Sequence, residues 1–119
     1  MENLHGKTAV ITGGASGIGL AMAHRFGAAG MNLVIGDIEV PAMEAAVAEL
    51  TAAGYQVVSL QVDVREIEQL RELEQVAVET FGNVHILCNN AGVGAGGPVA
   101  DPDNLEVWRW TIDINLWGV

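Results

Sequence analysis

The chain has 119 residues, half of them hydrophobic, which is enough for one modest domain with a buried core. Its 15 acidic and five basic residues give a net charge of −10, which argues against nucleic acid or an anionic membrane as a partner, because both bind basic patches. No apolar run approaches the ~18 residues that a membrane span needs, and the N-terminus lacks the order of a signal peptide. We therefore expect a cytoplasmic protein.

Apolar segments alternate with helical patterns along the chain. Strands are expected at 7–11, 32–36, 56–62 and 84–88. Helices are expected at 17–29, from Pro41 to the residue before Gly54, at 67–81, and from Asn104 toward the end of the chain. Residues 93–103, which are rich in Gly and Pro, are expected to form a loop.

The strands are continuously apolar and each is followed by a helix, which implies a parallel sheet covered on both faces. Right-handed crossovers then predict an α/β protein with a Rossmann-like, doubly wound sheet in the order 3-2-1-4. No linker or internal repeat divides residues 1–119, so we expect one dinucleotide-binding domain.

A glycine-rich run stands between the first strand and the first helix. It reads Thr12-Gly13-Gly14-Ala15-Ser16-Gly17-Ile18-Gly19. Glycines let the backbone turn tightly and let an anion approach, and the helix behind the loop offers unpaired N–H groups. An ordinary surface turn is the alternative, but a strand before the run and a helix after it are the context that a phosphate-binding loop requires.

Asp37 stands at the end of the second strand, 18 residues beyond Gly19. In a dinucleotide fold this position lies beside the adenosine ribose, where a carboxylate accepts hydrogen bonds from both hydroxyls and repels a 2′-phosphate. Position 16 is Ser and position 38 is Ile, so neither supplies a base for that phosphate. The pattern favours NAD, with a capping acid for the next helix as the alternative interpretation.

Two further motifs follow the third and fourth strands. Asp63-Val64 could meet the adenine, through the carboxylate and the Val64 backbone, or Asp63 could cap the next helix. The run Asn89-Asn90-Ala91-Gly92 permits close backbone approach to a cofactor or to a neighbouring strand, and could also be an ordinary turn.

The histidines and the single cysteine carry no predicted chemistry. His5, His24 and His85 have no acid or cysteine partner at a metal-binding spacing, so no metal site is expected. Cys88 lies in an apolar run and is interpreted as a packed core residue.

Together these motifs, with Asn115 in Asp113-Ile114-Asn115-Leu116, resemble the short-chain dehydrogenase/reductase family over nearly the whole chain. The resemblance implies hydride transfer between a nicotinamide and an alcohol or carbonyl. It implies that Asn89 ties the sheet together and that Asn115 is the asparagine of the catalytic tetrad. The predicted NAD-binding residues are Thr12, Gly13, Ser16, Gly17, Ile18, Gly19, Asp37, Asp63, Val64, Asn90, Ala91 and Gly92.

The sequence departs from the family at the catalytic tyrosine and lysine, which the family places four residues apart. The only tyrosine is Tyr55, four residues before Ser59, and the only lysine is Lys7. We therefore expect the N-terminal half of a dehydrogenase, truncated in the helix that carries Asn115 and inactive by itself. A dinucleotide-binding module or relic without turnover is the alternative.

The last predicted helix has two apolar stripes. They are Leu105, Trp108, Ile112 and Leu116, and Val107, Trp110, Ile114 and Trp117. A helix on one face of a sheet needs one stripe, so the second predicts burial against another subunit, as the resemblance also implies. The alternative is that Trp110 and Trp117 are simply exposed.

Overall fold

The computed structural model of the chain describes residues 3–92, 106, 109–110 and 113–119. Its elements, in chain order, are β1 (Thr8–Thr12), α1 (Gly17–Ala28), β2 (Asn32–Asp37), α2 (Val40–Ala52), β3 (Val57–Gln61), α3 (Ile67–Phe81), β4 (Ile86–Cys88) and the π-helix η2 (Asp113–Trp117). None of the helices described is long and apolar enough to cross a membrane.

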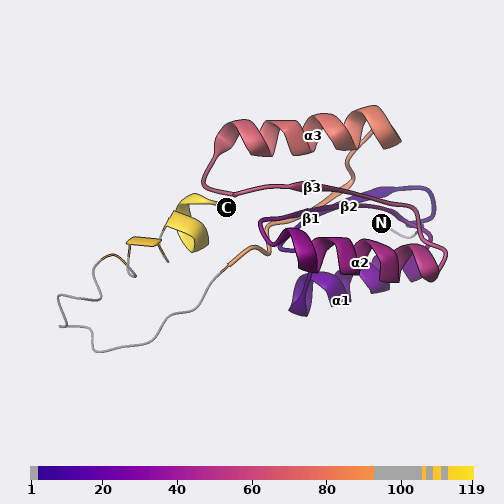
Figure 1. The fold of residues 1–119 in the computed structure, drawn as a ribbon. Coiled ribbons are helices and arrows are strands. Elements are labelled where there is room, and N and C mark those ends of the chain that lie inside the picture. Colours follow the sequence, from indigo (N-terminus) through magenta and orange to yellow (C-terminus); the bar gives the residue numbers. More distant parts are fainter. Residues whose placement is uncertain (1–2, 93–105, 107–108, 111–112) are drawn as a thin grey trace.

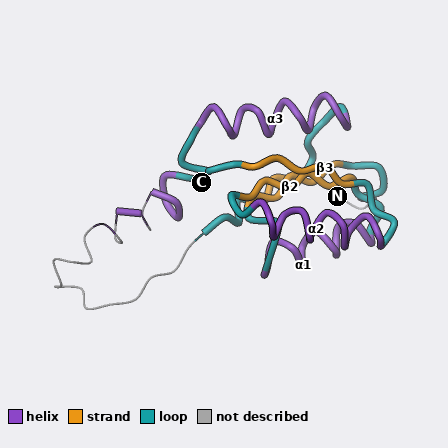
Figure 2. The backbone as a smooth tube through the Cα atoms, viewed as in Figure 1, coloured by secondary structure: helices purple, strands orange, loops and turns teal. Residues whose placement is uncertain are grey.

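The four strands form one parallel sheet in the order β3-β2-β1-β4, which confirms the predicted topology. Figure 1 shows α1 and α2 on one face of the sheet and α3 on the other. Figure 2 shows the strands as the middle layer between them. The chain therefore has the three-layer, doubly wound arrangement of a Rossmann-like fold.

Each face of the sheet has its own apolar cluster, because successive strand residues point to opposite faces. Ile11, Leu33 and Ile35 pack with Met43, Ala46 and Leu50 on the side of α1 and α2. Val10 and Val34 pack with Val62, Leu73 and Ala77 on the side of α3. Burial on both faces explains why the strands are apolar without alternation.

Cys88 and Tyr55 are partly buried against the cluster on the α1 and α2 side, which for Cys88 agrees with its interpretation as a packed core residue. Burial raises the pKa of the Cys88 thiol. A buried thiol with a raised pKa is a poor nucleophile at neutral pH.

The observed bounds differ from the predicted ones mainly at β4, which begins at Ile86 rather than at Val84. The N–H of His85 donates to the carbonyl of Thr8, at 2.9 Å. The N–H of Thr8, however, donates to the His85 side chain, at Nδ1, instead of to a backbone carbonyl. The regular ladder therefore starts only with the pair Ala9 and Ile86.

The end of the chain differs from the continuous α-helix that we expected from Asn104. Residues 104–105, 107–108 and 111–112 lie outside the described part. Residues 106 and 109–110 are α-helical, whereas Asp113–Trp117 is a π-helix, with one more residue in each turn than the expected form. In this wider turn Ile114 packs against the cluster on the α3 side.

Candidate functional site

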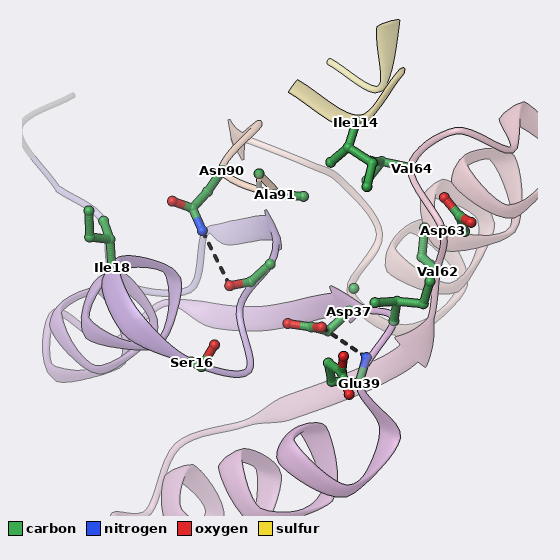
Figure 3. Close-up of a pocket in the computed structure, with 14 residues that line it drawn as sticks. Ser16, Ile18, Asp37, Glu39, Val62, Asp63, Val64, Asn90, Ala91 and Ile114 are labelled. Atoms are coloured by element: carbon green, nitrogen blue, oxygen red, sulfur yellow. Dashed lines mark hydrogen bonds between the residues drawn. The ribbon is translucent and has the colours of Figure 1, made fainter. Parts of the chain in front are cut away.

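A pocket of about 440 Å³ opens where the strands end at their carboxyl termini. Such a crevice is where ligands bind in open α/β sheets. Figure 3 draws the residues that line it. They come from the end of β2, from the loops after the four strands, from the first turn of α1 and from η2. They are Gly13, Ser16, Ile18, Gly36, Asp37, Ile38, Glu39, Val62, Asp63, Val64, Asn90, Ala91, Gly92 and Ile114.

The glycine-rich loop forms one wall of the pocket together with the start of α1. Gly17 has φ of 55°, and a Cβ there would meet no atom within 4 Å. A Cβ on Gly19 would collide with the carbonyl oxygen of Gly13, so only glycine allows this close approach. Ser16 makes no side-chain capping bond at the N-terminus of α1. A helix end without a cap leaves N–H groups that can bind an anion.

Asp37 connects three parts of the pocket wall through its carboxylate. Its Oδ2 accepts the backbone N–H of Ala15 at 3.1 Å, and its Oδ1 accepts that of Glu39 at 3.0 Å. Figure 3 marks the second of these bonds. The bond of Asp37 to Glu39 shapes the turn before α2 and does not cap the helix, because Glu39 itself holds the N-cap position. The same side chain also lines the pocket.

Asp63 is held by Arg65. The guanidinium Nη2 lies 2.7 Å from Oδ2, Nε lies 3.0 Å from Oδ1, and the backbone N–H of Arg65 also donates to Oδ1. These bonds lower the pKa of the Asp63 carboxyl, and Asp63 raises the pKa of Arg65 in return. Glu66 holds the N-cap position of α3 without a side-chain capping bond, and Asp63 shapes the turn before it rather than the helix end itself.

Thr12 joins the ends of β1 and β4 beneath the pocket. It is 3% exposed, and its hydroxyl accepts the N–H groups of Asn90, at 3.1 Å, and Ala91, at 3.2 Å. The side-chain amide of Asn90 donates to the carbonyl of Gly13 at 3.2 Å. Asn89, by contrast, is exposed, and its expected role in tying the sheet together stays a prediction.

Most of the predicted binding residues line the pocket, and four predicted site residues lie beside it. Thr12 is buried below it, and Gly17 and Gly19 belong to the loop and helix at its edge. Asn115 is exposed, and its Oδ1 lies 3.2 Å from where a Cβ on Gly92 would stand. The predicted residues from four separate segments therefore do meet at one edge of the sheet.

Five lining residues were not predicted: Gly36, Ile38, Glu39, Val62 and Ile114. The sequence contained one signal that Glu39 would line the pocket. Glu39 follows the end of β2 by two residues, and the carboxyl ends of parallel strands lie at the same edge of the sheet. Ile114 had no such signal, because only the turn of η2 brings it to Val64, as Figure 3 shows.

The charged side chains that line the pocket are all acidic, namely Asp37, Glu39 and Asp63. Of these, only Asp63 has a salt bridge within the described chain, to Arg65. The part of the chain that the structure describes also contains no group of histidine, cysteine and acidic side chains able to hold a metal ion.

Comparison with known proteins places this geometry in context. The profile of the short chain dehydrogenase family matches residues 7–119. The 1-deoxy-11-beta-hydroxypentalenate dehydrogenase of Streptomyces exfoliatus is 40% identical over 98% of this chain and 42% of its own length. The 3beta-hydroxysteroid dehydrogenase 1 of Eggerthella lenta is 42% identical over 99% of this chain and 45% of its own length.

Solved structures agree with the sequence relatives. A short chain dehydrogenase/reductase from Burkholderia phymatum, crystallised in complex with NAD, superimposes with a TM-score of 0.91 at 41% identity, over 99% of this chain and 42% of that one. The chain spans less than half the length of the relatives that it matches. Fold, motifs and family profile coincide over residues 7–119, and the chain belongs to the short-chain dehydrogenase family.

Proposed function

We propose that these residues form the cofactor-binding part of an NAD-dependent oxidoreductase that interconverts a secondary alcohol and its carbonyl compound. One observation carries the proposal: Asp37 ends β2 at the pocket and is fixed by hydrogen bonds to the loop before α1 and to the turn before α2. A carboxylate fixed there can accept the ribose hydroxyls of a dinucleotide whose phosphates lie at the N-terminus of α1.

The residues present fit a dinucleotide in two further respects. The space above Gly17 is open, so a pyrophosphate could approach the uncapped end of α1. The Asp63 carboxylate, kept ionised by Arg65, is an acceptor that an adenine amino group could use. A bound nicotinamide would supply the hydride chemistry, while this part of the chain binds and orients it.

The acid/base group of the proposed reaction must come from outside these residues. Tyr55 packs against the cluster on the α1 and α2 side and is not among the residues that line the pocket. Asn115, beside Gly92, is proposed to position groups near the reacting atoms rather than to exchange the proton itself. A dinucleotide-binding module without turnover is the second candidate, since no tyrosine or lysine is among the residues that line the pocket.

The test is made on the protein as its gene encodes it, with NAD and a panel of secondary alcohols. The proposal expects reduction of NAD with at least one alcohol, and NADH binding that weakens about tenfold or more in Asp37→Ala. NADH binding without turnover by any alcohol would favour the module. Failure to bind NADH would overturn both candidates.

We also propose that the end of the chain contacts a second copy. Trp110 is 40% exposed and Leu116 is 59% exposed in the described part, and large apolar side chains of this kind are commonly covered by a partner. Light scattering on the whole protein should give the mass of a dimer or larger assembly. A monomer at all concentrations would contradict this.

A further inference from the structure

Gln69 is the third residue of α3, and its side chain reaches back to the turn that follows β3. Its Oε1 accepts the backbone N–H of Asp63 at 2.7 Å. We propose that Gln69 is a positioning residue for the cofactor, which holds Asp63 where its carboxylate can accept the amino group of adenine. The inference rests on the proposed dinucleotide site, and it assigns a role to a residue that does not itself line the pocket.

The N–H of Asp63 needs a partner from outside the sheet. The N–H of Val62 donates to the carbonyl of Asp37 at 3.0 Å and so continues the pairing of β3 with β2. Because N–H groups of successive residues in an extended chain point to opposite sides, that of Asp63 points away from β2. β3 is the outer strand of the sheet, and no described strand pairs with its outer side. The Gln69 side chain therefore supplies the acceptor that a further strand would otherwise supply.

Arg65 fixes the Asp63 carboxylate only relative to the turn itself. The backbone N–H and the guanidinium of Arg65 both donate to this carboxylate. Arg65 is two residues from Asp63, so the pair can move together with the turn. Gln69 belongs to α3, which is held against the sheet by the buried side chain of Leu73. The bond from Asp63 to Gln69 thus ties the turn to a packed helix.

The Asp63 carboxylate has little freedom to adjust to a ligand. A carboxylate offers about four lone-pair positions, and the three donors of Arg65 already use most of them. The Asp63 side chain is 17% exposed, and Figure 3 shows it with Val62 and Val64 on one side of the pocket. Since hydrogen bonds weaken steeply as their angle departs from linearity, a small shift of the Asp63 backbone should weaken a bond to adenine.

The Gln69 side chain does not make the bond of an ordinary helix cap. In a capping box, a glutamine at the third helical position accepts the N–H of the N-cap residue, which here is Glu66. The N–H of Glu66 instead donates to the carbonyl of Asp63 at 2.9 Å, and Gln69 reaches three residues farther back. Its bond therefore serves the turn that carries Asp63, and its loss should be largest for a ligand that uses Asp63.

The experiment measures dissociation constants on the whole protein by the fluorescence of the reduced nicotinamide. The two ligands are NADH and reduced nicotinamide hypoxanthine dinucleotide, in which an oxygen that cannot donate to a carboxylate replaces the amino group of adenine. Gln69→Met removes the acceptor, and Gln69→Glu keeps an oxygen within reach. Gln75→Met is the matched control, since Gln75 is exposed on the same helix, donates to Glu79 at 2.8 Å and does not line the pocket.

Gln69→Met should weaken NADH binding about threefold to tenfold and binding of the hypoxanthine analogue less than about twofold. Gln69→Glu should keep NADH binding within about twofold of the unmodified protein, because the N–H of Asp63 retains its acceptor. Gln75→Met should change neither constant. If Gln69→Met does not fold, Gln69→Asn takes its place with the same expected loss, because its shorter side chain does not reach the N–H of Asp63.

Equal weakening of both ligands in Gln69→Met, or an unchanged NADH constant, would overturn this inference, while NADH binding by the unmodified protein would still support the proposed function. An unmodified protein that bound NADH no better than the hypoxanthine analogue would also overturn the inference alone. If the unmodified protein bound neither ligand, the inference and the proposed function would fail together.

Discussion

The carboxylate of Asp37 accepts a hydrogen bond from the backbone N–H of Ala15, 22 residues earlier in the chain, at 3.1 Å. Asp37 ends β2, and Ala15 is a buried residue of the glycine-rich loop. The side chain proposed to bind ribose therefore also holds the loop proposed to bind phosphate. Changing Asp37 should affect both the stability of the loop and the binding of the cofactor.

Two variants of Asp37 should separate these effects. Asp37→Asn keeps an oxygen that can accept one N–H group, whereas Asp37→Ala removes both acceptors. We expect Asp37→Ala to lower the free energy of unfolding by about 1–3 kcal/mol, because two N–H groups lose their partner, and Asp37→Asn to lower it less. Both should weaken NADH binding. Urea unfolding and fluorescence titration measure the two quantities, and equal stability of the two variants would contradict the role of the Ala15 bond.

Thr12 and Thr8 offer a matched pair of buried hydroxyls on the same strand. The Thr12 hydroxyl accepts the N–H groups of Asn90 and Ala91, whereas the buried Thr8 hydroxyl has no hydrogen-bond partner among the residues that the structure describes. Thr12→Val should therefore destabilise the fold by about 1–3 kcal/mol, because it leaves two donors unpaired. Thr8→Val should be neutral or stabilise by about 1 kcal/mol, because it removes an unsatisfied polar atom.

Urea unfolding of the two valine variants checks this expectation. The two substitutions change side-chain volume and strand propensity equally, so each serves as the control of the other. Equal destabilisation by both would show that the bonds of Thr12 contribute nothing specific to the link between β1 and β4.

The strand order was predictable because apolar strands that alternate with helices permit few topologies. In a parallel sheet of that order, all strands end at the same edge, so the residues that follow them were expected to lie there. Asp37 and the glycine-rich loop were thereby expected to meet. Their direct bond was not predictable, since the separation of 22 residues says nothing about which N–H the carboxylate selects.

Other features depend on contacts that no local pattern encodes. Periodicity predicted a helix over the last residues, but the wider turn of η2 depends on how Ile114 packs on the sheet and how Gly118 fits against Val64. The bond from the Asn90 amide to the carbonyl of Gly13 likewise joins residues 77 positions apart, which no local pattern predicts.

Substitution by alanine should change the stability differently at two glycines of the loop, Gly17 and Gly19. A Cβ on Gly19 would collide with the Gly13 carbonyl and approach Asn90 Nδ2 to 2.6 Å, so Gly19→Ala should destabilise the protein by more than about 2 kcal/mol. A Cβ on Gly17 would meet no atom within 4 Å. Gly17→Ala should therefore lower the stability only by about 1–2 kcal/mol, because a φ of 55° is unfavourable for alanine.

NADH binding should distinguish the alanine variants of Gly17 and Gly19 further. The methyl group of Gly17→Ala would stand in the open space at the N-terminus of α1, where the pyrophosphate is proposed to lie, so NADH binding should weaken well beyond the small loss of stability. Thermal unfolding and fluorescence titration of each variant give the comparison. Unimpaired NADH binding by a folded Gly17→Ala protein would place the phosphates elsewhere.

The ion pair of Asp63 with Arg65 should make part of the stability depend on pH. The folded pKa of Asp63 is lowered, chiefly by the Arg65 hydrogen bond. The stability that the pair contributes is therefore complete above the ordinary range of an aspartate, near pH 4, and is lost as the pH falls through the lowered folded value. Because the Arg65 side chain is 37% exposed, solvent screens the pair and its contribution to the stability is small.

Asp63→Asn keeps an acceptor for the Arg65 N–H and removes only the charge. Urea unfolding should find it less stable than the unmodified protein at neutral pH, with a difference that begins to shrink as the pH falls below about 4 and vanishes only below the lowered folded pKa of Asp63. Glu68→Gln is the control, since Glu68 pairs with Arg71 in the open, at 75% and 65% exposure, and should change stability by less than about 0.5 kcal/mol. A difference for Asp63→Asn that stays constant over this pH range would mean that the charge of Asp63 does not stabilise the fold.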